Sequence, residues 1–407
     1  MAALIWSSLL GLSAMMNGRA ATNPSPTLPL PKVFLFNANY LSTMRERISK
    51  NDPTLKGALE RLTRDADEAL KTRPMSVVNK STTPPSGDKH DYMSEAPYFW
   101  PDPASSNGLP YIRRDGERNP EINRITDHHN ILRLPDVVET LSLAYYFTEN
   151  ETYAAKAAEL LRVWFLDATT RMNPNLKYAQ AIRGVNDGRG IGLIESRGLI
   201  HVVEAAGLLA GSKSWTAADQ SGLQKWFGDF LDWMQHSKNG REEAAAKNNH
   251  GTYYDVQVVS FALFVDRREL ATNVLQTACQ KRIAVQIEPD GRQPLELVRT
   301  KAWSYSIGNL SGLMLLAKLG ESSGVDLWHF ETPDGRGIRR ALEYLEPYAA
   351  REKRWPYQQL GGWSPQGFVP LLRDAVLRYP DPKLKELLQK LSRTNLSDQD
   401  VLTRPPA

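Results

Sequence analysis

Two amides, an imidazole, two phenols and a carboxylate lie within one short stretch near the middle of the chain. The stretch reads Lys247-Asn248-Asn249-His250-Gly251-Thr252-Tyr253-Tyr254-Asp255, and an apolar run follows it at 256–264. The run predicts a buried helix, so the polar cluster is expected at the N-terminus of that helix. Free N–H groups and the positive end of the helix dipole suit an anionic ligand at such a position. Ordinary helix capping would also explain the asparagines taken alone.

A second polar cluster, residues 296–306, contains Arg299 and Tyr305, which are six residues apart. Taken alone, these two predict an ion pair and a core phenol. Together with Asn249 and His250 they match the requirements of β-elimination on a uronic acid polymer. Loss of the C5 proton places charge beside the sugar carboxylate, and donors such as Asn, Arg or His must neutralise it. A base takes the proton and an acid protonates the departing O4.

One tyrosine can serve as both base and acid when the proton and the leaving group lie on the same face of the sugar. The pKa of its phenol must then be lowered, and a nearby arginine can lower it.

These motifs, in this order, resemble those of the alginate-lyase-like polysaccharide lyases, helical toroids that act on β-1,4-linked polyuronates. Asn248-Asn249-His250 with the tyrosines after it resembles their Asn-Asn-His motif, and Arg299 with Tyr305 resembles their downstream Arg…Tyr element. The segments 89–103 and 173–192 look like loops of the branch that acts on mannuronan and glucuronan, and the resemblance extends over roughly 85–365. In the better-known pattern the Arg and Tyr are one residue further apart and His follows the Tyr, whereas Ser306 follows it here.

The resemblance implies roles for four side chains. Asn249 would neutralise the substrate carboxylate with help from His250 and Arg299, and Tyr305 would be both base and acid. His250 as base with Tyr305 as acid is the alternative, and it would suit anti elimination.

Mannuronate and glucuronate share their configuration at C4 and C5 and differ at C2, so the eliminating groups cannot distinguish them. Guluronate differs at C5 and needs a base on the other face. We therefore expect a β-1,4-linked mannuronan (alginate) or glucuronan as substrate, with no preference between the two and no indication of endo or exo action. The product would carry a 4,5-unsaturated uronate end.

Two other functions are compatible with parts of the sequence. An inverting glycoside hydrolase acting on an acidic polysaccharide would need a pair of carboxylates, for which Asp187, Glu195 and Asp255 are candidates. A non-catalytic polyuronate-binding protein would use the same cations and aromatic rings without turnover.

A polyanion in a cleft needs cations, hydrogen-bond donors and rings that stack on sugars. Glu195 and Asp255 are expected to orient Arg or His side chains. The candidates for substrate binding are Asn248, Tyr253, Tyr254, Arg113, Arg114, Asn186, Arg189, Glu195, Arg197, Lys301, Trp100 and Trp303, with Trp363 as a further ring.

Helical periodicity dominates the elements that must position these residues. Residues 41–72 are helical in character, and strand-like alternation is scarce. Helices separated by short links pack as antiparallel hairpins, so the chain is expected to be all-α, an incomplete α/α toroid with long ordered loops over a cleft. Residues 73–126 are irregular and rich in aromatics, which predicts a loop that forms a lid or wall. The segment 173–192, in which polar residues alternate with glycines, is expected to face the substrate. The predicted helices cover 131–149, 151–168, 193–211, 215–236, 253–265, 267–286, 303–319, 337–350, 366–378 and 382–393.

Composition limits the compartment and the partners. The chain has 407 residues, 41% hydrophobic and 24% charged, with a formal net charge of +4 and dispersed Lys and Arg, so nucleic acid is a poor candidate partner.

Residues 1–20 read as a signal peptide cleaved near Ala20, 21–32 as a proline-rich leader, and 33–407 as one domain, which predicts a periplasmic or secreted protein with no membrane segment after cleavage. Cys279 is the single cysteine and no HExxH spacing occurs, so neither a metal nor a cofactor is expected; His128 and His129 are expected near the start of a helix, one of them facing the cleft. The oligomeric state is not readable.

Overall fold

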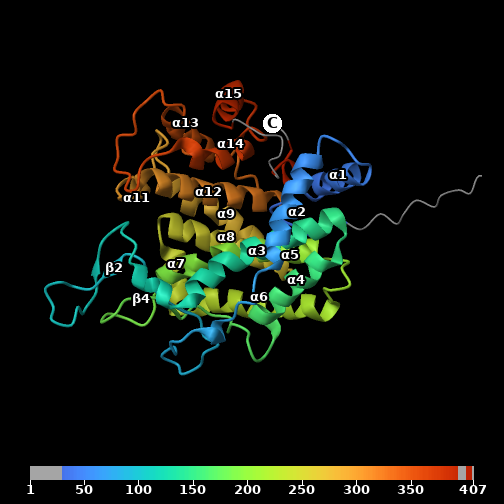
Figure 1. Ribbon diagram of the computed structural model, residues 1–407. Helices are drawn as coiled ribbons and strands as arrows, with labels where there is room; N and C mark the ends of the chain where they lie inside the picture. The colour runs from blue at the N-terminus through green and yellow to red at the C-terminus, as the bar shows by residue number, and fades with distance from the viewer. Residues whose placement is uncertain (1–29, 393–399, 406–407) are drawn as a thin grey trace, which may run out of the picture.

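The computed structural model describes residues 30–392 and 400–405 (Figure 1). The predicted signal peptide and almost all of the proline-rich leader lie outside these ranges. None of the helices within them is both long enough and apolar enough to cross a bilayer.

The described chain is built from helices that pack in antiparallel pairs, which confirms the all-α toroid. α3 packs against α2, α4 and α5, and α8 packs against α6, α9 and α12. In Figure 1 the C-terminal helices lie above α12, and the long loops gather on one side of the helical body. The principal helices are α1 (Ala38–Ser49), α2 (Lys56–Leu70), α3 (Thr126–Thr148), α4 (Glu151–Leu161), α5 (Leu199–Leu208), α6 (Ala217–His236), α7 (Lys238–Ala245), α8 (Asn249–Phe264), α9 (Arg268–Ala278), α10 (Ala284–Gln286), α11 (Pro294–Leu297), α12 (Ala302–Glu321), α13 (Ile338–Ala349), α14 (Val369–Ala375), α15 (Pro382–Leu391) and α16 (Asp400–Thr403).

Several predicted boundaries were wrong for local physical reasons. The helix predicted from residue 253 already begins at Asn249, because Asn248 caps it with its side chain. The predicted helix 193–211 is a 3-10 segment, η4 (Gly190–Gly198), followed by α5. The predicted stretch 41–72 is two helices, since Asn51 turns the chain with a φ of 58°. Helix α7 escaped prediction because its sequence is short and strongly polar.

The apolar run 256–264 is the buried centre of the fold, as predicted. From Val256 to Phe264 every residue of α8 is buried. Two rings of α6 pack against Phe261 of α8, with centroid distances of 4.8 Å from Phe227 and 5.9 Å from Phe230. Burial on all sides fixes α8 in place, so its polar first turn has a defined position at the end of the toroid.

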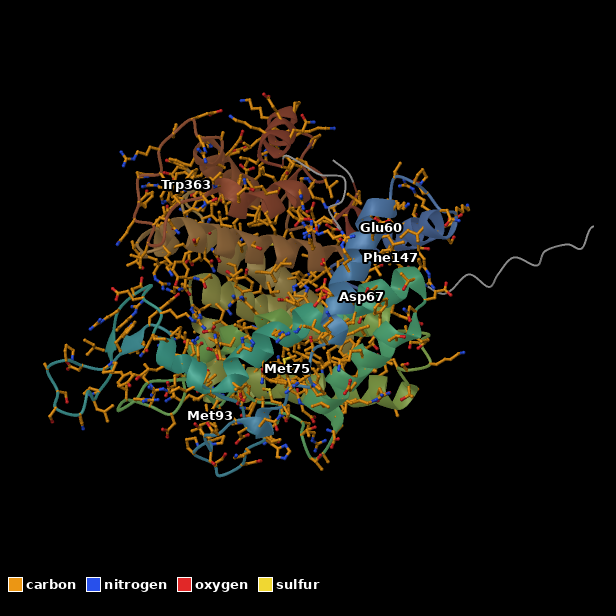
Figure 2. The ribbon with its side chains drawn as sticks, in the orientation of Figure 1. Glu60, Asp67, Met75, Met93, Phe147 and Trp363 are labelled. Carbon is orange, nitrogen blue, oxygen red and sulfur yellow. The ribbon has the colours of Figure 1, made fainter. Side chains whose placement is uncertain are left out.

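The two irregular segments are ordered and pair with each other. β1 (Met93–Glu95) runs parallel to β4 (Tyr178–Ala181), and β2 (Phe99–Trp100) pairs antiparallel with β3 (Ile112–Arg113). Figure 2 labels Met93, the first residue of β1, at the lower left of the view. Residues 73–126, called the wall loop below, are therefore held against the segment that leads into η4.

A buried arginine joins α7 to α8 just ahead of the polar cluster. Arg282 donates to both oxygens of Asp255, at 2.7 and 3.0 Å, and to the carbonyls of Ala244 and Ala246. The glycine in the cluster is explained by this contact, because a Cβ at Gly251 would lie 2.2 Å from Nη1 of Arg282. Arg282 and its carboxylate partner are almost completely buried.

We expect Arg282→Met to lower the free energy of unfolding by about 3–5 kcal/mol, since it leaves a buried carboxylate and two carbonyls without their donor. Urea unfolding followed by circular dichroism measures the change. Arg268→Met, at an exposed position on α9, is the matched control and should change stability by less than about 0.5 kcal/mol. A loss below about 1 kcal/mol for Arg282→Met would show that the ion pair does not hold this junction together.

Candidate active site

A cleft of about 710 Å³ opens where the first turns of α8 and α12 meet the wall loop and η4. Six cations line it, and Glu195 is the only carboxylate among the lining residues that the structure describes. The lining residues are Pro97, Tyr98, Phe99, Arg113, Arg118, His128, Leu132, Gln180, Arg189, Ile191, Ile194, Glu195, Arg197, Asn248, Asn249, His250, Tyr253, Arg299, Lys301, Ser304, Tyr305 and Gly308. The four predicted catalytic residues are thus brought together in one cationic cleft.

The first turn of α8 is capped by the protein itself. The side chain of Asn248 accepts from the N–H of His250 at 3.3 Å, and Glu296 accepts from the N–H of Asn249 at 2.7 Å. These backbone donors are therefore engaged, so the capping explanation is right for them. An anionic ligand at this end has to be bound mainly by side chains.

Buried Glu296 also fixes the orientation of the Asn249 amide. Nδ2 of Asn249 lies 2.9 and 2.8 Å from the two carboxylate oxygens. Burial raises the pKa of Glu296, although hydrogen bonds from Asn249 oppose the shift. A raised pKa means that this carboxyl binds a proton more readily than an exposed one would.

His250 is oriented in a similar way by a second buried acid, Glu243 on α7. Nδ1 of His250 lies 2.8 Å from the carboxylate of Glu243, which is 1% exposed. A carboxylate in this position favours the tautomer with hydrogen on Nδ1 and leaves Nε2 as the proton acceptor. No described residue makes a hydrogen bond to Nε2, and the ring lines the cleft.

Arg299 and Tyr305 meet because α12 begins between them. Nη2 of Arg299 donates to the phenol oxygen of Tyr305 at 2.8 Å, and the guanidinium carbon lies 3.9 Å from the centre of the ring. The phenol donates to the hydroxyl of Tyr98 on the wall loop at 3.1 Å. Arg299 also donates to both oxygens of Asp115, at 2.8 and 3.2 Å.

The expected lowering of the Tyr305 pKa is not found. Burial raises the pKa of Tyr305 well above its ordinary value, and the hydrogen bond with Tyr98 adds to this effect. Arg299 acts in the opposite direction but is outweighed, since Asp115 takes up part of its charge. Hydrogen bonds from Arg299 and Thr300 outweigh burial at Asp115 and hold the pKa of that carboxyl well below its usual range. Tyr305 is therefore a protonated phenol at neutral pH in the free protein.

A histidine of α3 also lines the cleft and has no hydrogen-bond partner in the described chain. His128 is buried, its Nδ1 lies 3.1 Å from Glu195, and neither ring nitrogen makes a hydrogen bond within the described chain. Glu195 accepts from the hydroxyls of Tyr92 and Ser94, both at 2.6 Å. Glu195 thus stands beside a histidine, as expected, and the imidazole remains available to a ligand.

The lining cations differ in how firmly they are held. Arg189 donates to the side chain of Gln180 at 2.8 Å, and burial lowers its pKa. Arg197 lies over the ring of Tyr253, 5.7 Å from its centre. Arg113 shares Asp115 with Arg299, whereas Lys301 has no carboxylate partner in the described chain.

Some predicted substrate-binding residues do not line the cleft. Tyr254 is buried and donates to the carbonyl of Met234, and Trp303 is 2% exposed and donates to the carbonyl of Ser364. Both predictions were wrong, because these rings belong to the core. Trp100 and Arg114 stack on each other outside the cleft, with 5.3 Å from the guanidinium carbon to the ring centre.

Three further predicted residues lie elsewhere. Asn186 closes the turn at Ile182 by accepting from its N–H at 3.3 Å. Trp363 lines a different groove. Asp255 lies outside the cleft lining but contacts Arg282, in line with the expectation that it orients an arginine or a histidine. Asp187 does not line the cleft either, so the pair of carboxylates that an inverting hydrolase requires is not present among the described lining residues.

Several residues that complete the site carry little signal in the sequence. Glu243, which contacts His250, lies in the polar helix α7. Glu296 and Asp115 contact Asn249 and Arg299, respectively, from distant positions in the sequence. Tyr98, Arg118 and Gln180 lie in irregular segments without periodicity. The described residues contain no group of three or more His, Cys, Asp or Glu side chains arranged to hold a metal ion.

Comparison with known proteins agrees with this geometry. A crystal structure of an alginate lyase from Bacteroides ovatus matches with a TM-score of 0.88 and 40% identity, covering 92% of this chain and 99% of that chain. Alginate lyase A1-III from Sphingomonas species A1 matches with a TM-score of 0.58 and 15% identity, covering 94% of this chain and 100% of that chain, and so shares the fold. No curated protein gives a significant match.

Fold and similarity define a polysaccharide lyase built as an α/α toroid. The family model described as alginate lyase matches residues 76–355, and the chain belongs to this family.

Asp115→Asn should reduce kcat/KM for elimination by roughly one to two decades, the usual effect of losing a hydrogen bond to a charged group. The change weakens the link between the wall loop and Arg299. Asp102→Asn, on the same loop and outside the cleft, serves as the matched control and should retain activity. Equal rates for wild type and Asp115→Asn would mean that this link does not organise the site.

Proposed function

We propose that this lyase cleaves β-1,4-linked polyuronate by β-elimination, with mannuronan as the main substrate and glucuronan as the second candidate. The observation that carries the proposal is the contact of Arg299 with Tyr305, in a cationic cleft that also contains Asn249 and His250. The titles of the similar structures describe alginate lyases, which supports the choice of mannuronan.

The excess of cations fits a polyanionic chain. Six lining cations face one lining carboxylate, and that carboxylate is buried. In a partly dry cleft, such charges attract acidic sugars more strongly than they would in water. At the reacting sugar we assign Asn249 to the carboxylate: Nδ2 carries two hydrogens, so one can stay on Glu296 while the other bonds the substrate.

The resting protonation states favour a division of labour between His250 and Tyr305. Nε2 of His250 accepts the C5 proton, the C4–O4 bond breaks, and the electron pair of the C–H bond forms the C4=C5 double bond. Tyr305 gives its proton to O4, and the guanidinium of Arg299 stabilises the phenolate that results. The proton on His250 then restores the phenol by way of solvent. The alternative with Tyr305 as both base and acid would need a phenolate at rest, against the direction of its pKa.

The positions of the two groups fit elimination from one face of the sugar. His250 lies in the first turn of α8 and Tyr305 in the first turn of α12, and these two helices pack side by side. We therefore assign base and acid to the same wall of the cleft, in contrast to the anti elimination that the sequence had suggested for this pair of residues. Mannuronate and glucuronate present the C5 proton and O4 on the same face, whereas guluronate does not.

A panel of polymannuronate, glucuronan and polyguluronate tests the proposed substrate through the ultraviolet absorbance of the unsaturated product. We expect the fastest rise with polymannuronate, a slower rise with glucuronan, and little with polyguluronate. Tyr305→Phe should give no product with any polymer, while Tyr111→Phe, whose phenol lies outside the cleft, should remain active. Preferred cleavage of polyguluronate would refute the one-face geometry.

The pH dependence of kcat/KM separates the two assignments of the base. Because burial raises the Tyr305 pKa above the ordinary value of 10.0, the phenol stays protonated up to that pH and beyond. With Tyr305 as the acid, kcat/KM should not rise between about pH 8 and about pH 10, and should fall only at higher pH, where the phenol loses its proton. A resting phenolate as base would instead give a tenfold rise per pH unit over this range.

A further inference from the structure

A second groove, of about 480 Å³, is lined by the segment that links α13 to α14. We call it the rim groove; it is lined by Arg351, Glu352, Lys353, Arg354, Trp355, Tyr357, Gln359 and Trp363. Its volume is within the range of about 300–1,000 Å³ that is typical of small-ligand sites. Figure 2 labels Trp363 on this part of the chain, above α12.

The rim groove is cationic. Arg351, Lys353 and Arg354 are all exposed, and none of them makes an ion pair within the described chain. Glu352 is the only carboxylate among the lining residues described. Exposed cations without a carboxylate partner also occur elsewhere in the described chain, for example Arg61 and Arg64 on α2, but these three line one groove.

Two indole rings stand beside these cations. Trp355 and Trp363 are half-buried, but the ring N–H of each is buried and has no hydrogen-bond partner in the described chain. The exposed part of each ring is therefore carbon, which is the surface that packs on the C–H faces of sugars. Arg351 lies over Trp363, with 5.9 Å between the guanidinium carbon and the ring centre.

The core behind the groove holds these rings in place. Buried Trp303 packs against both, with centroid distances of 5.0 Å to Trp355 and 5.4 Å to Trp363. Tyr348 and Tyr357 flank Trp355 at 5.1 and 5.2 Å. The rings are thus positioned before any ligand binds, which reduces the entropic cost of binding.

Gln359 connects the rim groove to the cleft. Its Oε1 accepts from the N–H of Trp303 at 3.0 Å, and its Nε2 donates to the hydroxyl of Ser304 at 2.8 Å. Ser304 lines the cleft while Gln359 lines the groove. The backbone of Leu360 also donates to Thr300, next to Lys301 on the cleft wall. The two cavities therefore share one wall.

We propose that the rim groove is a distal subsite that binds the acidic polysaccharide beyond the sugars held at the reacting position. Unpaired cations match uronate carboxylates, the exposed indole carbons match sugar rings, and the shared wall lets one chain occupy both cavities. This proposal rests on the proposed function, since it takes the same polymer as ligand. The subsite contributes affinity for long chains and has no part in proton transfer.

The double variant Lys353→Gln/Arg354→Gln removes two exposed charges and tests the subsite in the full-length enzyme. On long polymannuronate it should raise KM roughly three- to tenfold with kcat unchanged, the range that two exposed ion pairs supply. On a mannuronate tetrasaccharide it should leave both constants as in wild type. The increase in KM should shrink as salt is added, because exposed charges are screened.

The matched control is Arg61→Gln/Arg64→Gln, which removes two exposed and unpaired charges from α2, and its KM should stay at the wild-type value. Trp363→Ala is the second test and should raise KM on the polymer alone, even at high salt. The distal subsite is refuted if both rim-groove variants keep the wild-type KM on the polymer. It is also refuted if they raise KM equally on the polymer and on the tetrasaccharide. Failure of the wild-type enzyme to cleave polymannuronate or glucuronan would refute the proposed function instead.

Discussion

The guanidinium of Arg299 is the contact on which the site depends. It bonds the phenol of Tyr305 on α12 and both oxygens of Asp115 on the wall loop at the same time. One cation therefore positions the phenol of Tyr305 and holds the wall loop against the helical body. Such a guanidinium suits this position, because its planar fork can serve two partners in fixed directions.

Buried acids set the remaining geometry. Glu243 orients His250, Glu296 orients Asn249, and Asp255 with Arg282 fixes the junction ahead of them. Each of these carboxylates is almost completely buried and hydrogen-bonded, as burial of a charge requires. The substrate-facing side chains thus keep their orientation in the absence of ligand, which is the preorganisation that stabilisation of a carbanion needs.

The sequence was sufficient for the fold class and for the convergence of four side chains. A continuous apolar run predicted the central helix, and the order of the motifs indicated which polar residues meet. It was not sufficient to decide which of two adjacent tyrosines contacts the substrate. Tyr253 and Tyr254 point about 100° apart on a helix, so only Tyr253 faces the cleft. Trp303 was assigned to stacking because burial of an isolated aromatic has no sequence signature. Asp115 and Glu296 were missed because their partners, Arg299 and Asn249, lie 184 and 47 residues away in the sequence. Partners at such distances leave no local pattern.

The most direct test is a crystal structure of the Tyr305→Phe enzyme with a bound mannuronate tetrasaccharide. We expect a sugar carboxylate within about 3.5 Å of Asn249 or His250, with the O4 of that sugar facing the ring at position 305. A tetrasaccharide that contacts only arginines of the cleft, with no sugar between His250 and the ring at position 305, would contradict the proposed site.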